Sequence, residues 1–161
     1  MKQEKPRRAR NKGGMMTDTL RQEPSNRDLA QQHAEALLAA ARRAQTFAYA
    51  PYSNFAVGAA ALLIDGTIYP GCNVENASFG MTVCAERVAL FSAISAGRLD
   101  IAAVAVVTDA PALCKPCGAC RQVIAEFSRA DNPIIILSAC ASDETGLEPI
   151  TTLLPDNFIL L

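Results

Sequence analysis

Long apolar runs are absent from this chain of 161 residues. No stretch approaches the roughly 18 consecutive apolar residues that a membrane-spanning helix requires, and the N-terminus lacks the apolar core of a secretory signal. We therefore expect a cytoplasmic protein without a membrane partner. Half of the residues are apolar and 19% are charged, which is ordinary for a globular protein with a core of its own.

Histidine is equally scarce, because His33 is the only one. It lies on the Leu29/Leu37 stripe of an expected helix, and no metal-binding residue is near it in the sequence. The pattern favours a histidine on a helix face over a metal ligand. Repeats and internal linkers are also missing, so residues 25–161 are expected to form one domain.

Charge of one sign dominates only at the N-terminus. Residues 1–14 carry six basic side chains against Glu4 alone, a balance of +5, which leaves −6 for the rest of a chain whose net charge is −1. We expect residues 1–24 to be a disordered basic tail. The acidic remainder argues against a nucleic-acid groove, which needs clustered positive charge, so no nucleic-acid partner is expected.

The hydrophobic pattern predicts helices that alternate with strands. A capping box, Ser25 to Asp28, opens a first helix that continues to about Ala48. Two apolar runs around Asp65-Gly66 predict a hairpin, and Pro70 places its second strand at the sheet edge. The other expected elements are a helix over 83–96, a strand over 101–107, a helix from 117 to before 132, a strand over 134–137, a weaker strand near 147–151 and a short helix around 153–154. This order implies a three-layer α/β/α domain with a mixed, largely parallel five-stranded sheet.

Three of the six cysteines have the spacing of a metal site. Cys117 and Cys120 stand three residues apart, so on one helix turn they can chelate one ion, and Cys84 falls at the start of another expected helix. Three thiolates leave a fourth position open, as in catalytic zinc sites. Glu86, two residues after Cys84, is free to carry protons for a metal-bound water. The pattern predicts a hydrolytic zinc site.

The expected topology brings the two helix starts together. In a right-handed crossover, the starts of the helices that carry Cys84 and Cys117 lie side by side at one edge of the sheet. Each helix N-terminus presents about half a positive charge, which offsets the charge of the thiolates. Arg87 and Arg121 are expected to hydrogen-bond the sulfurs and withdraw charge from them.

Cys114 complicates this interpretation, because residues 114–117 form a second C-x-x-C sequence that overlaps the first. Alone it is typical of a redox pair or of part of an iron–sulfur ligand run. Such a run expects a further cysteine soon after Cys120, and the next is Cys140. We interpret Cys114 as a bystander, and Cys72 and Cys140 as small core or strand residues.

The zinc motifs belong to a longer series of blocks that resembles the cytidine deaminase family, in particular its small homotetrameric type with three cysteine ligands. The resemblance covers roughly residues 28 to 158. The blocks are AYAPYSNF (48–55), VGAA (57–60), GCNVENAS (71–78), CAER (84–87) and PCGACRQ (116–122). A C-x-x-C sequence by itself is weak support, whereas these blocks in this order are specific.

The resemblance implies hydrolysis of cytidine and 2′-deoxycytidine to uridine and 2′-deoxyuridine with release of ammonia, a step of pyrimidine salvage. Cys84, Cys117 and Cys120 would hold one Zn²⁺ per subunit, with water as the fourth ligand. Glu86 would move the water's proton to ring N3 and later protonate the departing amine, which is help worth about 10²–10⁴ in rate. The backbone of Ala85 would contact the pyrimidine oxygen.

Asn73 and Glu75 match the family's ribose ligands, and Phe55 matches a residue that packs against the pyrimidine ring. Two residues apart on an extended segment, the Asn73 and Glu75 side chains point the same way. An amide and a carboxylate can together satisfy a sugar 3′-hydroxyl. The alternatives are that this pair only caps the turn after the second strand, and that Phe55 is a core aromatic.

The resemblance also implies a homotetramer whose active sites are completed across subunit contacts. Ala77 and Phe79 would approach a neighbour's ligand, and Phe158 would close another site. Relatives often have tyrosine where this chain has Phe79, so the hydrogen bond of that hydroxyl is missing here. Arg121 and Gln122, like Arg87, would surround the metal ligands.

Three other functions compete with this one. A sister deaminase acting on an antibiotic nucleoside such as blasticidin S is the first, but Arg87 and the complete 73–76 block favour ordinary nucleosides. A polynucleotide-editing deaminase needs a basic channel, which the acidic body lacks. The third is a non-enzymatic zinc scaffold with Cys114 as fourth ligand, but such a site gives Glu86 no function.

Overall fold

The computed structural model describes residues 24–159. Its elements are α1 (Asn26–Gln32), α2 (Ala34–Gln45), β1 (Val57–Leu63), β2 (Ile68–Cys72), the 3₁₀ helix η1 (Phe79–Met81), α3 (Ala85–Ser95), β3 (Ile101–Thr108), α4 (Gly118–Glu126), β4 (Ile135–Ala139), β5 (Thr145–Pro149) and α5 (Ile150–Leu153). Apart from its last residue, Pro24, the predicted basic tail lies outside the described residues. Within 24–159, no helix combines the length and apolar character needed to cross a membrane.

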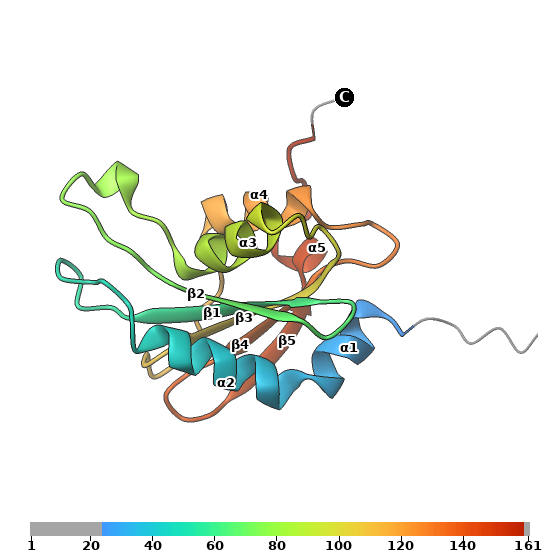
Figure 1. The fold of residues 1–161 in the computed structure, drawn as a ribbon, viewed down its shortest axis with the longest axis horizontal. Coiled ribbons are helices and arrows are strands. Elements are labelled where there is room, and N and C mark those ends of the chain that lie inside the picture. Colours follow the sequence, from blue (N-terminus) through green and yellow to red (C-terminus); the bar gives the residue numbers. More distant parts are fainter. Residues whose placement is uncertain (1–23, 160–161) are drawn as a thin grey trace, which may run out of the picture.

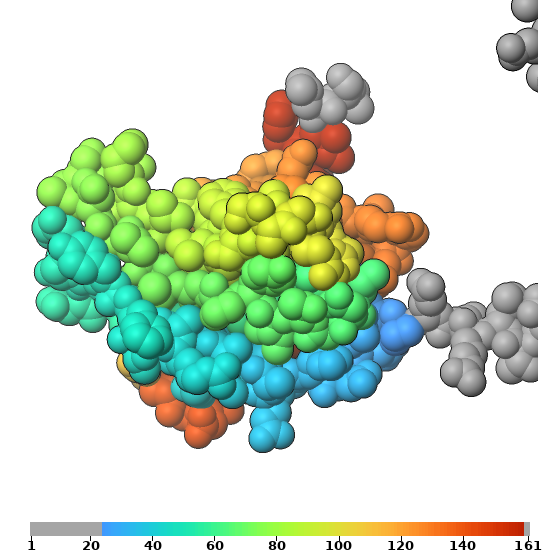
Figure 2. Space-filling model, viewed as in Figure 1, coloured from blue at the N-terminus to red at the C-terminus, as the bar shows by residue number. Residues whose placement is uncertain are grey.

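The five strands form one sheet in the order β2-β1-β3-β4-β5. Helices α1 and α2 cover one face of the sheet, and α3, α4 and α5 lie on the other (Figure 1). Figure 2 shows the first of these layers in blue and cyan below the green and yellow of β2 and α3. The three-layer α/β/α architecture and the five-stranded mixed sheet are therefore confirmed.

The prediction that the sheet is largely parallel is wrong. Only β3 and β4 pair in parallel, whereas β1 pairs antiparallel with both β2 and β3, and β4 pairs antiparallel with β5. The physical reason is that the tight Asp65-Gly66 turn makes β1 antiparallel to β2, and β3 then pairs with the other side of β1 instead of with β2. Strands β2, β3 and β4 still run in the same direction, so α3 and α4 are both crossover helices and begin at the same edge of the sheet.

The predicted first helix is two helices that meet at His33. Ser25 and Asp28 form the expected capping box at the start of α1. His33 has φ −102° and ψ 9°, and it lies against Gly66 in the turn between β1 and β2. His33 therefore lies at the junction of the two helices and not on a helix face as predicted, and it is not part of the one cluster of metal-ligating residues found among the described residues. The chain leaves the helical conformation before Ala48 because Tyr49 is drawn into a bridge with Val74.

Small side chains on β1 allow helices to approach both faces of the sheet. Ala60 and Leu62 point into the core beneath α1 and α2, whereas Ala59 and Ala61 pack against α3. Strand β3 is buried along its whole length, which explains its continuously apolar sequence. This close packing fixes the position of α3, the helix that begins at the predicted zinc site.

Two loops project together from one end of the domain. Residues 46–56 and 73–82, cyan and light green, lie alongside each other in both views (Figures 1 and 2). The backbone of Tyr49 joins them, because its N–H donates to Asn73 and its carbonyl accepts from Glu75. Val74, which bridges to Tyr49 on one side, bridges to Val83 on the other. That bridge holds residue 83 extended, so α3 begins at Ala85 and not at Val83.

Candidate active site

Cys84 and Cys117 are the N-cap residues of α3 and α4, one residue before the first helical turn in which they were expected. Both have extended backbone conformations, and neither side chain caps its own helix. The two sulfurs are therefore free to face each other across the helix starts. Cys120 comes from the first turn of α4 and is fully buried.

The three sulfurs form a compact cluster. All lie within 4.8 Å of one another, and the Cys84 and Cys117 sulfurs are 3.9 Å apart. Tetrahedral zinc with Zn–S bonds of about 2.3 Å requires sulfurs separated by about 3.8 Å. Spacing and ligand type thus fit zinc, and three protein ligands leave the fourth position open.

The groups around the cluster favour a negatively charged thiolate, which attracts a cation. Hydrogen bonds from Cys120 and Arg87 hold the pKa of the Cys84 thiol at about 5, below its ordinary value, although burial opposes this shift. The pKa of Cys120 is raised because its thiol hydrogen-bonds Cys84 and is itself buried. Arg87 lies with its Nη2 atom 3.7 Å from the Cys84 sulfur and also donates to the Thr82 carbonyl. The predicted contact of Arg87 with a sulfur is therefore present.

Glu86 lies beside the sulfurs at the wall of a cavity of about 430 Å³. It is only 4% exposed, and burial raises the pKa of its carboxyl, with a further rise from the Cys84 charge. Cys84, Ala85 and Cys117 line the same cavity. A buried carboxyl with a raised pKa next to a three-sulfur cluster is suited to carrying protons to and from a bound substrate.

Asn73, Glu75 and Phe55 line the cavity as well. The Asn73 amide is bonded to backbone on both sides, since it accepts from the Val57 N–H at 2.8 Å and donates to the Phe55 carbonyl at 2.9 Å. Glu75 accepts three hydrogen bonds from Tyr52 and Ser53, and the Ser53 hydroxyl is the main cause of its lowered pKa. The predicted ribose ligands thus face the cavity, and they also brace the loop that carries Phe55.

The sequence of this chain is similar to those of known proteins. A sequence model for the cytidine and deoxycytidylate deaminase zinc-binding region matches residues 31–136. The chain belongs to this family. A cytidine deaminase of Sporosarcina psychrophila is 53% identical over 102 residues, which cover 63% of this chain and 75% of the relative.

Solved structures of this family have the same fold. The crystal structure of cytidine deaminase from Burkholderia pseudomallei matches with a TM-score of 0.73 and 46% identity, over 77% of this chain and 98% of that one. The Mycobacterium tuberculosis enzyme matches with a TM-score of 0.67 and 39% identity, over 79% of this chain and 98% of that one. The match covers nearly the whole of both solved chains.

Two residues expected around the metal in this deaminase chain make different contacts. The prediction that Arg121 hydrogen-bonds a sulfur is wrong, because its guanidinium donates to the carbonyls of Pro116 at 2.7 Å and Leu153 at 2.9 Å. The Gln122 amide accepts from the N–H of Phe158 and donates to its carbonyl. Both side chains therefore join the metal-binding helix α4 to the C-terminal segment, which extends beyond α5 (Figure 1).

The residues expected to act across subunits do not line the cavity of their own chain. Ala77 is exposed, Phe79 is 77% exposed and Phe158 is 71% exposed. Phe79 packs edge-to-face on Tyr52, with ring centroids 6.1 Å apart. Their role in a neighbouring site of the deaminase remains a prediction.

Cys114 lines the cavity but is not part of the sulfur cluster. Its thiol lies 3.8 Å from the Ala112 carbonyl. Several other residues line the cavity without a role predicted from the sequence, among them Ser53, Thr108 and Lys115. Only the position of Ser53 within the 48–55 block could have drawn attention to it, because the side chains of Thr108 and Lys115 reach the cavity through the fold.

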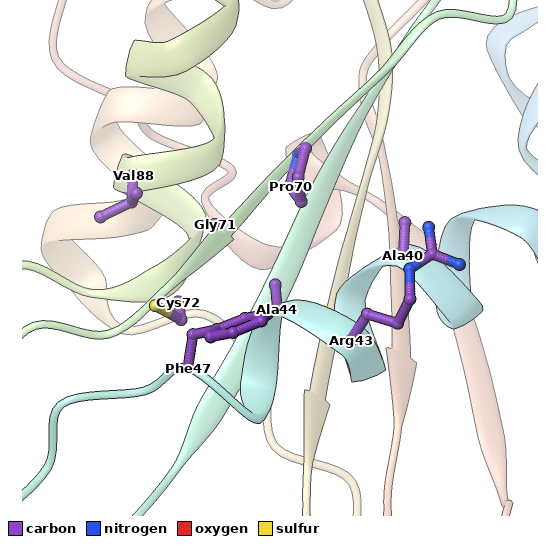
Figure 3. A pocket seen from close by; sticks show the side chains of 8 residues that line it. All are labelled: Ala40, Arg43, Ala44, Phe47, Pro70, Gly71, Cys72 and Val88. Atoms are coloured by element: carbon purple, nitrogen blue, oxygen red, sulfur yellow. The ribbon is translucent and has the colours of Figure 1, made fainter.

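A second hollow, of about 390 Å³, lies between α2, β2 and α3 (Figure 3). Its walls are mostly apolar. Figure 3 shows the Phe47 ring extending toward Ala44, whereas the Arg43 guanidinium is turned away from it. This hollow offers neither a carboxylate nor a sulfur cluster, so it lacks the groups that deaminase chemistry needs.

Proposed function

We propose that this protein hydrolyses cytidine and 2′-deoxycytidine to uridine and 2′-deoxyuridine with release of ammonia. The observation that carries the proposal is the open three-sulfur cluster beside the buried Glu86 carboxyl, at the wall of a cavity that Asn73 and Glu75 also line. A closed structural zinc site has four protein ligands. The cluster has three, and Cys114 does not complete it.

Each residue of the site has a separate role in the proposed reaction. Cys84, Cys117 and Cys120 would hold zinc, which when bound would supply the activation of a water molecule near neutral pH. Glu86 takes a proton from that water, delivers it to ring N3 and then protonates the departing amine. The backbone of Ala85 at the start of α3 binds the pyrimidine oxygen, and Phe55 packs against the ring. Burial of Glu86 supports these roles because a raised pKa makes the carboxyl a better proton carrier at neutral pH.

The cavity favours nucleosides over nucleotides. Lys115 is the cation among its lining residues, and it is already paired with Glu148. Glu75, which also lines the cavity, adds negative charge that repels a phosphate. We therefore assign unphosphorylated cytidine and 2′-deoxycytidine as substrates, with Asn73 and Glu75 bound to the sugar.

The assembly that suits this site is a homotetramer with shared active sites, working in pyrimidine salvage in the cytoplasm. The exposed aromatic side chains of Phe79 and Phe158 support shared sites, because each ring could bury its apolar surface against a neighbouring chain. Size-exclusion chromatography with light scattering tests the assembly. A monomer that is fully active contradicts the shared-site proposal.

The activity is tested by incubating zinc-loaded protein with cytidine, 2′-deoxycytidine, deoxycytidine monophosphate and blasticidin S, and measuring ammonia release. We expect turnover of the first two. Preferred turnover of blasticidin S identifies the antibiotic deaminase instead, and turnover of the monophosphate contradicts the choice of nucleosides. Zinc binding without release of ammonia from any of them indicates a zinc scaffold.

A further inference from the structure

Ser53 lies at the centre of a series of hydrogen bonds at the wall of the cavity. Its hydroxyl donates to Glu75 Oε1 and accepts from the Phe55 N–H, whose nitrogen lies 3.0 Å away. The other carboxylate oxygen of Glu75 accepts from the N–H groups of Tyr52 at 2.9 Å and Ser53 at 3.2 Å. A hydroxyl has one proton, so the chain runs in one direction, from Phe55 through Ser53 to Glu75.

The Glu75 carboxylate has little acceptor capacity left for a substrate. A carboxylate offers about four lone-pair sites, two on each oxygen. Both sites of Oε2 are taken by backbone N–H groups, and one site of Oε1 is taken by the Ser53 hydroxyl. One site on Oε1 remains. Because Ser53 and Glu75 both line the cavity, the Ser53 hydroxyl decides where this last site points.

The same series of hydrogen bonds fixes both backbone groups of Phe55. Its N–H is bound by Ser53, and its carbonyl is bound by Asn73, which also accepts from Val57. Between Ser53 and Phe55, Asn54 has a φ of +55°, a left-handed conformation that asparagine tolerates better than most residues. This turn lets Ser53 and Phe55 both face the segment after β2 that carries Asn73 and Glu75. The group that packs against the base and the group that binds the sugar are thus parts of one network.

We propose that Ser53 is a positioning residue, which aims the free acceptor site of Glu75 at the 3′-hydroxyl of the nucleoside. The proposal rests on the proposed function, because it takes Glu75 as a sugar ligand. Ser53 does not touch the reacting atoms, so its removal affects substrate binding and leaves zinc content unchanged.

The test compares cytidine with 3′-deoxycytidine in the wild type and in Ser53→Ala. A hydrogen bond to a charged group is typically worth about ten- to hundredfold in binding. For cytidine we expect Ser53→Ala to raise KM by about that factor, with a much smaller effect on kcat. For 3′-deoxycytidine, which has no hydroxyl to aim at, the KM should change much less. Ser53→Thr keeps the hydroxyl and should restore most of the preference for the 3′-hydroxyl.

Two controls separate this role from a general loss of structure. Ser95→Ala removes another exposed serine hydroxyl, at the far end of α3, which donates to the Ser92 carbonyl. It should leave both KM values unchanged. If Ser53→Ala lowers kcat/KM equally for both nucleosides, or changes neither, the proposal is wrong.

Product binding tests the proposal independently of turnover. Calorimetric titration with uridine and 3′-deoxyuridine needs no catalysis, and it should show the same loss of preference in Ser53→Ala. A wild type that releases no ammonia from cytidine but binds uridine better than 3′-deoxyuridine contradicts the proposed function and leaves Ser53 testable. Equal binding of the two products by the wild type overturns the assignment of Glu75 as a sugar ligand, and with it the role of Ser53.

Discussion

Gly71→Ala is expected to damage the zinc site from a distance, through the packing of β2 against α3. A methyl group at Gly71 would lie 2.4 Å from the amide nitrogen and 2.9 Å from the Cα of Ala89, and 2.8 Å from the carbonyl oxygen of Ala85. All three atoms belong to the backbone of α3, so no side-chain rotation can relieve the contact. To reach an ordinary separation of about 3.5 Å, the helix must move by about 1 Å.

This displacement affects stability and activity together. Overpacking of this kind costs about 1–3 kcal/mol, and for a chain of this size each kcal/mol lowers the thermal midpoint by about 2–4 °C. Because α3 carries Cys84 and Glu86, both shift relative to Cys117 and Cys120 on α4. A misplacement of about 1 Å at a reacting centre can cost about 10²-fold in rate.

The assay is calorimetry of wild type and Gly71→Ala at equal zinc content and protein concentration, together with ammonia release from cytidine. Gly80→Ala is the matched control, because a methyl group there meets nothing within 4 Å. It should behave like the wild type. A Gly71→Ala variant whose thermal midpoint stays within about 1 °C of the wild type and whose kcat/KM is unchanged refutes the packing argument.

Three further predictions concern the metal and its surroundings. Removing zinc with a chelator should abolish turnover and lower the thermal midpoint, and added zinc should restore both. Arg87→Ala removes the donor to Cys84 and should weaken zinc binding about ten- to hundredfold in a competition titration, whereas Arg43→Ala should not. Gln122→Ala releases Phe158 and should raise KM for cytidine at unchanged zinc content; an unchanged KM shows that this contact does not matter.

The zinc site was predictable because its signals are local. Cys117 and Cys120 share one helix turn, and Cys84 and Glu86 share the start of another, so periodicity alone defines each half of the site. The right-handed crossover then brings the halves together. No tertiary contact outside these elements is needed to predict the sulfur cluster.

Contacts that depend on distant backbone were not predictable. Arg121 donates to the Leu153 carbonyl, and nothing around Arg121 in the sequence indicates where residue 153 lies. In the same way, the bridges of Val74 with Tyr49 and Val83 determine where α2 ends and α3 begins. The prediction of a largely parallel sheet was wrong for a related reason, since alternation of helices and strands does not reveal that β1 lies between β2 and β3.

The central claim is that Glu86 moves protons at a site whose metal is held by sulfur alone. Glu86→Gln keeps the size of the side chain and removes its ability to accept a proton. The most direct measurement is zinc content and ammonia release from cytidine in the same preparation of this variant. We predict full zinc content with turnover reduced by about 10²–10⁴ or more. Full zinc content with turnover equal to the wild type contradicts the account.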